Sequence, residues 1–289
     1  MGHVVEFVKG HGTQNDFVLI PDPDNGLDLS PRLVAAICDR RAGVGADGVL
    51  RVVRASTAPE AAGQAGEAEW FMDYRNADGS VAEMCGNGAR VFARYLLDAG
   101  LVGAGPFAVA TRGGVKPVRF EPDGQVTVDL GIAELPGELD GVEVSVAGRS
   151  WPATGALLPN PHAVARVEDL ADVGRLADPP KVTPADAYPD GANVEFVVDR
   201  GAAHVAMRVH ERGVGETRSC GTGVAAAAVV SRRRAGYGVS DDFARTWTVD
   251  VPGGRLRVVE RADGHVELTG PAVLVAAGRL RPELLDGAR

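Results

Sequence analysis

Apolar and polar residues alternate in several segments of the chain, which is the pattern of strands with one buried face. Two of these segments, residues 111–133 and 251–272, resemble each other closely. In each, a Gly-Gly pair is followed ten residues later by the glycine of an Asp-Gly turn, with alternating residues on both sides. Both segments therefore predict two-stranded hairpins. The runs WFMDYRN and HVAMRVHE, which end at Asn76 and Glu211, predict two more strands.

Two helices are expected directly after two similar cysteine turns. The turn MCGNGAR around Cys85 precedes VFARYLLDAG, and the turn SCGTGVA around Cys220 precedes VAAAAVVSRRR. The two cysteines lie 135 residues apart, and each follows the end of a predicted strand by nine residues. A thiol in the first turn of a helix lies next to free backbone N–H groups and the positive end of the helix dipole. Because these favour the thiolate, we expect both thiols to have lowered pKa values.

A third helix is expected from Ser30 to Arg41. Ser30 is a good N-cap residue, and Pro31 suits the first helical position because its missing N–H has no partner there. Cys38, the third cysteine, lies on the apolar face of this helix. Because a buried thiol behaves as a small hydrophobic group, we expect Cys38 to pack in the core.

The repeated features are displaced by 135 to 145 residues, so the chain reads as two copies of a unit of ~140 residues. Each copy is β-rich with one central helix, which predicts an α+β fold. We expect two pseudo-symmetric β-rich domains, each wrapped around its central helix, with the active site in the cleft between them. The first domain is placed at residues 1–118 plus 276–289, and the second at residues 119–275.

Three segments are expected to connect or complete these domains. Residues 56–69 are rich in Ala, Gly and Glu and lack bulky apolar side chains, which predicts a mobile surface excursion between two strands. Residues 132–143 contain Pro136 and Gly137 and are expected to form the passage between the halves. Residues 273–280 read as a strand that returns to one of the two halves.

Charge and composition exclude several classes of protein. The net charge is −9, and the only basic cluster, Arg232–Arg234, falls where the second cysteine-led helix should end. We therefore expect no nucleic acid as partner. No apolar run reaches the ~18 residues that a membrane span needs, and the N-terminal segment lacks the pattern of a signal peptide. Three cysteines without an export signal predict a reducing, cytoplasmic setting.

The paired cysteine turns indicate acid–base chemistry with two thiols. Two rival interpretations of the turns are a buried structural thiol and an incidental disulfide. Six scattered histidines and no Cys-x-x-Cys predict no metal site. The run from Gly221 also fits a dinucleotide pattern, but a polar, glycine-broken segment precedes it where a buried strand should stand. The glycines fit better as close backbone N–H donors to an anion such as a carboxylate.

Several polar residues in turn-like contexts suit a zwitterionic substrate. The asparagines are Asn15, Asn76, Asn160 and Asn193. Each alone is more often a turn residue, but together they supply uncharged donors and acceptors. Glu211 and Arg212, which end a predicted strand, have the charges to hold an ammonium and a carboxylate. His162 is either a structural hydrogen-bonding residue or a polar partner of one thiol.

Taken together, the motifs MCGNGAR, HERGVGETRSCGTG, GTQNDF, RNADGS, PNPH and VPGGRL with LTGPA resemble those of the diaminopimelate epimerases. The resemblance runs from about residue 3 to about residue 280. It implies the pseudo-symmetric two-domain fold and an isomerase that interconverts L,L- and meso-diaminopimelate in lysine and peptidoglycan precursor synthesis. It also implies that the enzyme needs no cofactor and forms a homodimer. The chain has only three lysines, none of them in a setting suited to a pyridoxal Schiff base.

The resemblance also implies roles for individual residues. Cys85 and Cys220 match the catalytic cysteines, and His162 and Glu211 match positions that tune the thiols. The substrate contacts that it implies are Asn15, Asn76, Gly86, Asn87, Asn160, Asn193, Glu211, Arg212, Gly221 and Thr222. Elementary chemistry agrees, because inverting a stereocentre without a cofactor requires one group to remove the α-proton and another to deliver a proton to the opposite face.

Two features leave alternatives open. Gly48 replaces a Gln that contacts substrate in many relatives, and a Pro stands before Asn160 where a Gly is common. The proline and hydroxyproline racemases share paired cysteine turns, but their first turn carries a His where this chain has Asn87. A non-catalytic amino-acid-binding protein of the same fold is the other alternative, and the presence of both cysteines disfavours it.

Overall fold

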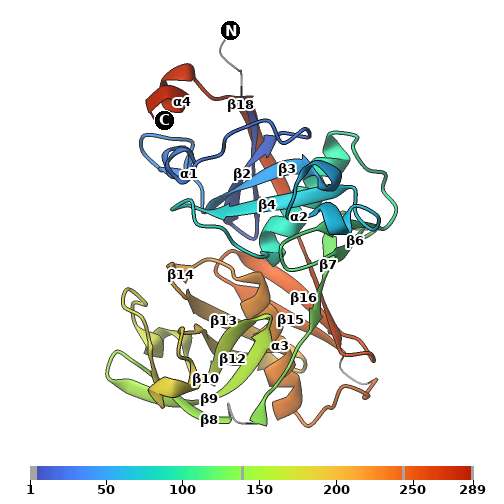
Figure 1. The fold of residues 1–289 in the computed structure, drawn as a ribbon. Coiled ribbons are helices and arrows are strands. Elements are labelled where there is room, and N and C mark those ends of the chain that lie inside the picture. Colours follow the sequence, from blue (N-terminus) through green and yellow to red (C-terminus); the bar gives the residue numbers. More distant parts are fainter. Residues whose placement is uncertain (1–4, 138–139, 243–244, 288–289) are drawn as a thin grey trace. The chain divides into compact units, whose positions relative to one another are not determined.

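The computed structural model describes residues 5–137, 140–242 and 245–287, which fold into two compact units (Figure 1). Unit 1 comprises Met1–Val128 and Pro271–Arg289, and unit 2 comprises Asp129–Gly270. The boundaries expected from the sequence, 118/119 and 275/276, would cut through two strands. The division at 128/129 falls within β7, which passes from one unit to the other. The expected passage at 132–143 includes residues 138 and 139, which lie outside the described residues.

Unit 1 is a mixed sheet with one long helix against it. Its elements are β1 (Glu6–Gly12), β2 (Asn15–Pro21), α1 (Pro31–Cys38), β3 (Gly48–Arg54), η1 (Ala55–Thr57), η2 (Ala62–Gln64), β4 (Trp70–Asn76), α2 (Gly86–Asp98), β5 (Phe107–Ala110), β6 (Lys116–Phe120), β7 (Val126–Ile132), which continues into unit 2, β18 (Val273–Arg279) and α4 (Pro282–Gly287). Strands β18, β1, β2, β3, β4, β5, β6 and β7 pair in this order, with parallel ladders only at β2–β3 and β4–β5. The predicted strand at 273–280 is β18, and it pairs with β1.

Unit 2 repeats this plan around a second helix. Its elements are β8 (Asp140–Val146), β9 (Arg149–Leu158), β10 (Asn160–Arg166), η4 (Leu170–Val173), β11 (Lys181–Thr183), η5 (Ala185–Ala187), β12 (Asn193–Gly201), β13 (His204–Glu211), β14 (Gly215–Thr217), α3 (Gly221–Arg234), β15 (Thr246–Val251), β16 (Gly254–Glu260) and β17 (His265–Gly270). Strands β11, β8, β9, β10, β12, β13, β15, β16 and β17 pair in this order, and β14 also pairs with β13.

Each unit has a buried helix at its centre. Helix α2 contacts β1–β4 and β18, whereas α3 contacts β9, β10, β12, β13 and β15–β17. The first twelve residues of α3 are all buried, which only small side chains such as its four alanines and two glycines allow in a crowded core. The β-rich α+β prediction, with one central helix per half, is confirmed. Both predicted hairpins are also present, as β6–β7 and β16–β17.

Helix α1 begins as predicted but ends three residues early. The Ser30 hydroxyl accepts a hydrogen bond from the Leu33 N–H at 3.2 Å, and Pro31 is the first helical residue. The helix ends at Cys38 because the Asp39 carboxylate accepts from the N–H groups of Arg41 and Ala42 at 2.7 and 2.6 Å. A side chain that captures the next N–H groups in this way offers the backbone an alternative to the helix. Cys38 is buried in the core of unit 1, as expected.

The segment 56–69 lies between β3 and β4 with most of its residues exposed, as predicted for a surface excursion, and three of its alanines anchor it to unit 1. Its alanines at 58, 61 and 68 are buried against Phe71 and Ala110. The Gln64 side chain donates to the Thr111 carbonyl at 2.9 Å and accepts from the Thr111 N–H at 3.3 Å. Small side chains suffice here because the segment lies close enough for alanine methyl groups to fill the gap. Among the described residues, no helix is long and apolar enough to cross a membrane.

Candidate active site

Cys85 caps the N-terminus of α2 with its sulfur. The residue has an extended backbone, with φ of −141° and ψ of 119°, and its Sγ accepts a hydrogen bond from the Gly88 N–H at 3.3 Å. This is the role that Ser, Thr, Asp or Asn usually plays at an N-cap. Cys85 is half-buried, so its thiol combines a backbone donor with partial access to solvent. That is the setting of a reactive cysteine.

One asparagine contacts the Cys85 thiol, and a second asparagine is hydrogen-bonded to the first. Asn15 is the first residue of β2, and its Oδ1 lies 3.7 Å from Cys85 Sγ. The same Oδ1 accepts a hydrogen bond of 3.1 Å from Asn87 Nδ2, and Asn15 Nδ2 donates to Asp47 Oδ2 at 2.8 Å. Asp47 therefore sets the direction of the Asn15 amide, because a carboxylate only accepts and so draws the NH₂ end to itself.

Arg90 is a fully buried cation one turn into α2, and sequence reasoning missed it. It donates to Asn87 Oδ1 at 2.9 Å, to Thr13 Oγ1 at 3.1 Å and to the backbone carbonyls of Gly86 and Pro271. These partners within the described part of the chain are all neutral. Burial lowers the pKa of Arg90 to about 10, while the charge of Cys85 acts in the opposite direction. Arg90 therefore remains charged at neutral pH and favours an anion at Cys85.

Two other positions in unit 1 behave differently. Asn76 ends β4, and its Nδ2 donates to Ser80 Oγ at 3.0 Å, so the structure does not join Asn76 to the Asn15 amide by a hydrogen bond. At Gly48 a Cβ would lie 2.5 Å from the Arg75 carbonyl oxygen. That contact is with backbone, which cannot rotate away. The close pairing of β3 with β4 therefore leaves no room for a side chain at position 48 in this structure.

Cys220 is the N-cap residue of α3 and has a similar extended backbone, but among the residues that the structure describes its side chain makes no capping hydrogen bond. Its sulfur is buried and lies 3.6 Å from Thr222 Oγ1. Burial raises the pKa of Cys220 well above its usual value, and the nearby carboxylates of Glu211 and Glu195 raise it further. The Thr222 hydroxyl and the Gly223 N–H act in the opposite direction without overcoming the burial. The lowered pKa predicted for this thiol is wrong, because desolvation outweighs the helix dipole here.

Glu195 was not predicted, yet it is fully buried beside the candidate site. Its Oε1 lies 2.7 Å from His162 Nδ1, and both side chains are inaccessible to solvent. His162 Nε2 in turn lies 3.0 Å from Asn160 Oδ1. Glu195 stands in the run ANVEFVV, where an acidic residue within an apolar strand is the signal that could have found it. The structure thus joins the predicted residues His162 and Asn160 directly, with the Glu195 carboxylate on the other ring nitrogen of His162.

Asn193 and Arg212 are joined through the backbone. Asn193 is the first residue of β12, and its Oδ1 accepts from the Arg212 N–H at 2.9 Å. The Arg212 guanidinium donates to the Asp190 carbonyl at 3.2 Å. The Thr217 hydroxyl donates to Glu211 Oε1, which holds this carboxylate at the end of β13. Gly221 and Thr222 form the buried first turn of α3.

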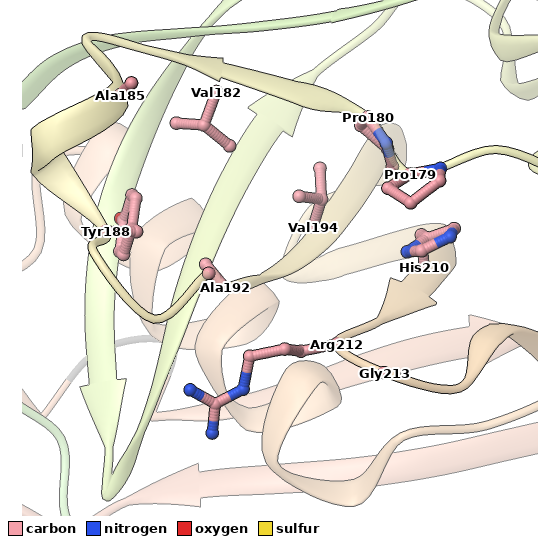
Figure 2. Close-up of a pocket in the computed structure, with 11 residues that line it drawn as sticks. Pro179, Pro180, Val182, Ala185, Tyr188, Ala192, Val194, His210, Arg212 and Gly213 are labelled. Atoms are coloured by element: carbon pink, nitrogen blue, oxygen red, sulfur yellow. The ribbon is translucent and has the colours of Figure 1, made fainter.

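A pocket of about 230 Å³ is lined in part by Arg212, but Cys220 is not among its described lining residues (Figure 2). Its lining includes Pro179, Tyr188, Val194 and His210. Residues 194 and 210 alternate along their strands with Glu195 and Glu211, so they point to the opposite face. Burial lowers the pKa of His210, which leaves the Arg212 guanidinium as the charged group of this lining. The pocket therefore lies on the other side of the sheet from the buried carboxylates.

Within the described residues, each unit has a cysteine at the N-cap of its central helix, with polar side chains nearby. Unit 1 brings Asn15, Cys85, Gly86 and Asn87 together. Unit 2 links Asn160 to His162 and Asn193 to Arg212, and it places Glu211 and Thr222 close enough to Cys220 to affect its pKa. Within the described ranges, no group of three His, Cys, Asp or Glu side chains is arranged to hold a metal ion.

Comparison with known proteins decides the family. The sequence model of the diaminopimelate epimerase family matches residues 7–136 and 157–275. The chain is 62% identical over 284 residues to a protein named diaminopimelate epimerase from Streptomyces coelicolor, covering 98% of both chains. This chain belongs to the diaminopimelate epimerase family. The diaminopimelate epimerases, rather than the proline racemases, are therefore the relatives that its sequence matches.

Two solved structures show that the fold extends beyond the diaminopimelate epimerases. A phenazine biosynthesis protein of the PhzF family from Bacillus anthracis superimposes with a TM-score of 0.67 at 16% identity, covering 97% of this chain and 100% of the other. A hydroxyproline epimerase from Agrobacterium vitis superimposes with the same TM-score at 14% identity, covering 96% and 92%. At such low identity these likenesses establish the fold alone.

Proposed function

We propose that this chain interconverts L,L- and meso-diaminopimelate without a cofactor, with Cys85 and Cys220 as the two acid–base groups. The observation that carries the proposal is the cysteine at the N-cap position of the central helix in each unit, in a chain 62% identical to a relative named for this activity. The two-cysteine mechanism is the part of the proposal that experiment has to decide.

The surroundings of the two thiols support different starting roles. Cys85 accepts a backbone N–H and lies near the buried cation Arg90, while its protonated form can donate to Asn15 Oδ1. We propose that the cation decides between the two forms, and we assign Cys85 the thiolate. Cys220 is fully buried near two carboxylates, so we assign it the thiol. In this state the Cys85 sulfur removes the α-hydrogen as a proton and leaves the electron pair on the α-carbon. The Cys220 S–H then delivers its proton to the opposite face and becomes the thiolate, and the reverse reaction exchanges the roles.

The intermediate carbanion needs electrostatic stabilisation because the α-proton of an amino acid is weakly acidic. We propose that backbone N–H groups in the first turns of α2 and α3, at Gly86–Asn87 and Gly221–Thr222, hold the α-carboxylate. The remaining proposed contacts are Asn15, Asn76, Asn160 and Asn193 with the charged pair Glu211 and Arg212. His162 and Glu211 are proposed to tune the thiols, and Glu211 is supported by its effect on the pKa of Cys220.

The decisive experiment is incubation with L,L-diaminopimelate in D₂O without added cofactor. We expect deuterium at one α-carbon and formation of the meso isomer. Cys85→Ala and Cys220→Ala should each abolish epimerisation, because the reaction needs proton removal on one face of the α-carbon and proton delivery on the other. Cys38→Ala is the matched control, since this thiol lies in the core, and it should remain active. Exchange of proline in place of diaminopimelate would move the assignment to the racemase alternative.

The setting of the enzyme is also a proposal. We propose a homodimer in the cytoplasm that acts on a small-molecule substrate and has neither nucleic acid nor a membrane as partner. The acidic net charge of −9 supports the absence of nucleic acid. Light scattering over a range of protein concentrations tests the dimer, and a mass equal to one chain at every concentration would reject it.

A further inference from the structure

In the described part of the chain, Glu195 has no arginine partner, unlike the buried carboxylates of Asp73 and Glu260. Asp73 contacts Arg51, Arg75 and Arg112, and Glu260 contacts Arg232 and Arg233. Glu195 has the His162 ring, and its second oxygen, Oε2, makes no hydrogen bond within the described residues. Burying a carboxylate with so little compensation is costly, so a role beyond packing has to explain its position.

The position of Glu195 relative to α3 supplies that role. A Cβ built on Gly223 would lie 2.6 Å from Glu195 Oε1 and 3.3 Å from Cys220 Cβ. The carboxylate and the cysteine therefore flank the same glycine in the first turn of the helix. The absence of a side chain at Gly223 is what admits the carboxylate. An anion at a helix N-terminus is stabilised by the dipole and the free N–H groups, so Glu195 occupies the place that would stabilise a thiolate.

We propose that Glu195 is a positioning residue that holds Cys220 in its protonated form by placing a negative charge at the N-terminus of α3. This inference rests on the proposed function and deepens it. His162, hydrogen-bonded to the carboxylate, holds that charge in place. Without Glu195 one of the two carboxylates that disfavour the Cys220 thiolate would be lost, while the burial of the thiol and the charge of Glu211 would remain.

The α2 cap provides the internal comparison. The equivalent glycine, Gly88, faces Leu50, Phe17 and Cys85 itself, and all of these contacts are with carbon atoms. Five residues after Cys85 stands the cation Arg90, whereas five residues after Cys220 stands an alanine. The two caps have the same backbone geometry and opposite electrostatic surroundings. A proton transfer that needs one thiolate and one thiol requires such a difference in the resting enzyme.

The charged groups around Cys220 in unit 2 come from several elements. Glu195 approaches from β12 and Glu211 from β13, and both raise the pKa of the thiol. His162 on β10 is bound to Glu195. Glu260 on β16 is bound to Arg232 in the last turn of α3, at the other end of the helix. Glu211 has the larger effect of the two carboxylates, and Glu195 is the one that a side chain at Gly223 would meet.

The first test measures the thiol directly and needs no catalytic activity. Iodoacetamide modification of each cysteine, followed by peptide mass mapping over a range of pH, compares the wild type with Glu195→Gln, Glu195→Asp and Asp199→Asn. Cys220 of Glu195→Gln should react about tenfold faster at mildly alkaline pH, because the thiolate is the nucleophile and a shift of one unit changes its fraction tenfold. Asp199 lies on the same strand but is exposed, so its variant should match the wild type.

Glu195→Asp separates charge from packing. It keeps the carboxylate but shortens the side chain, so Cys220 should stay slow to react. Equal acceleration in Glu195→Asp and Glu195→Gln would assign the effect to loosened packing and overturn the proposal. No acceleration in Glu195→Gln would also overturn it. Because this result is independent of turnover, it stands even if the enzyme does not epimerise diaminopimelate.

The second test uses the pH dependence of kcat/KM. If Cys220 has to carry a proton, the alkaline limb of the profile reports its loss, and the acidic limb reports ionisation of the other thiol. Glu195→Gln should move the alkaline limb to lower pH by about one unit and leave the acidic limb in place. A purely structural role would lower kcat/KM equally at every pH, which would contradict the proposal.

Discussion

Gly88 and Gly223 hold the same place in the two cysteine turns, three residues after the N-cap cysteine, but a side chain would meet different neighbours at each. At Gly88 a Cβ would have its nearest contacts at 3.3 to 3.5 Å, all with carbon atoms. At Gly223 it would lie 2.6 Å from Glu195 Oε1, an atom held by His162. The duplication has preserved the glycine while the reason for it differs between the two units.

Gly223→Ala should therefore cost far more than Gly88→Ala. The new methyl group displaces the Glu195 carboxylate from His162 and leaves buried polar atoms without partners, which costs about 1–3 kcal/mol. At Gly88 the flexible Leu50 side chain can move, and the gain in helix propensity of about 1 kcal/mol offsets the crowding. Urea unfolding of both variants checks the difference. Equal losses in the free energy of unfolding would refute it.

Arg90→Met should slow the reaction of Cys85 with iodoacetamide. The substitution keeps an unbranched side chain in the core but removes the buried cation that favours an anion at the thiol. We expect about a tenfold lower rate at neutral pH, which corresponds to one unit in thiol ionisation. Arg94→Met is the control, because Arg94 lies one turn further along the same helix and contacts the Gly124 carbonyl instead. Similar rates in the two variants would argue against Arg90.

Much of the fold could be predicted because local patterns decide it. The strands ending at Asn76 and Glu211, both hairpins and both cysteine-led helices lie where alternation, turn glycines and apolar runs indicate them. The Ser30 cap follows from local chemistry in the same way. The end of α1 and the packing of residues 56–69 could not be predicted, since they depend on which N–H groups Asp39 captures and on how closely alanine methyl groups approach Phe71.

In the candidate site, too, residues marked by local motifs could be predicted, whereas residues that only the fold brings to the site could not. Residues in glycine-rich turns, such as Cys85 and Cys220, stand out from the sequence because short motifs surround them. Arg90 does not, because it looks like a surface charge until the fold buries it, and Glu195 is marked only by its place within an apolar strand. The pKa of Cys220 could not be predicted for the same reason: desolvation and two carboxylates from distant strands outweigh the helix dipole.

Gln64→Ala should loosen the loop that leads to Cys85. Gln64 makes two hydrogen bonds with the Thr111 backbone. Two residues further along, the Gly113 N–H donates to the Glu83 carbonyl at 3.1 Å, and Glu83 lies two residues before Cys85. Losing both side-chain hydrogen bonds should cost about 1–2 kcal/mol in urea unfolding and reduce kcat severalfold. Glu67→Ala, an exposed change in the same segment, should alter neither quantity. An unchanged Gln64→Ala would show that the loop holds Cys85 without this clamp.

Asp73 should make unit 1 less stable at acid pH than at neutral pH. Burial raises the pKa of Asp73, but hydrogen bonds from Arg75 and Arg112 outweigh it and leave the pKa below the ordinary value of 3.8. A carboxyl with a lowered folded-state pKa contributes stability that is complete above its unfolded-state value and is lost as the pH falls through the folded-state value. The contribution of Asp73 should therefore be present at neutral pH and disappear below about pH 4.

Asp73→Asn tests this dependence. At neutral pH the variant leaves three arginines without their shared carboxylate and should lose about 3–5 kcal/mol in urea unfolding. As the pH falls below about 4, the wild type loses the same interaction, so the difference between the two proteins should shrink. Asp24→Asn serves as the control, because Asp24 is an exposed partner of Arg54 and should change stability little at any pH. A gap between wild type and Asp73→Asn that stays constant down to acid pH would mean that packing, rather than the carboxylate charge, holds these arginines in place.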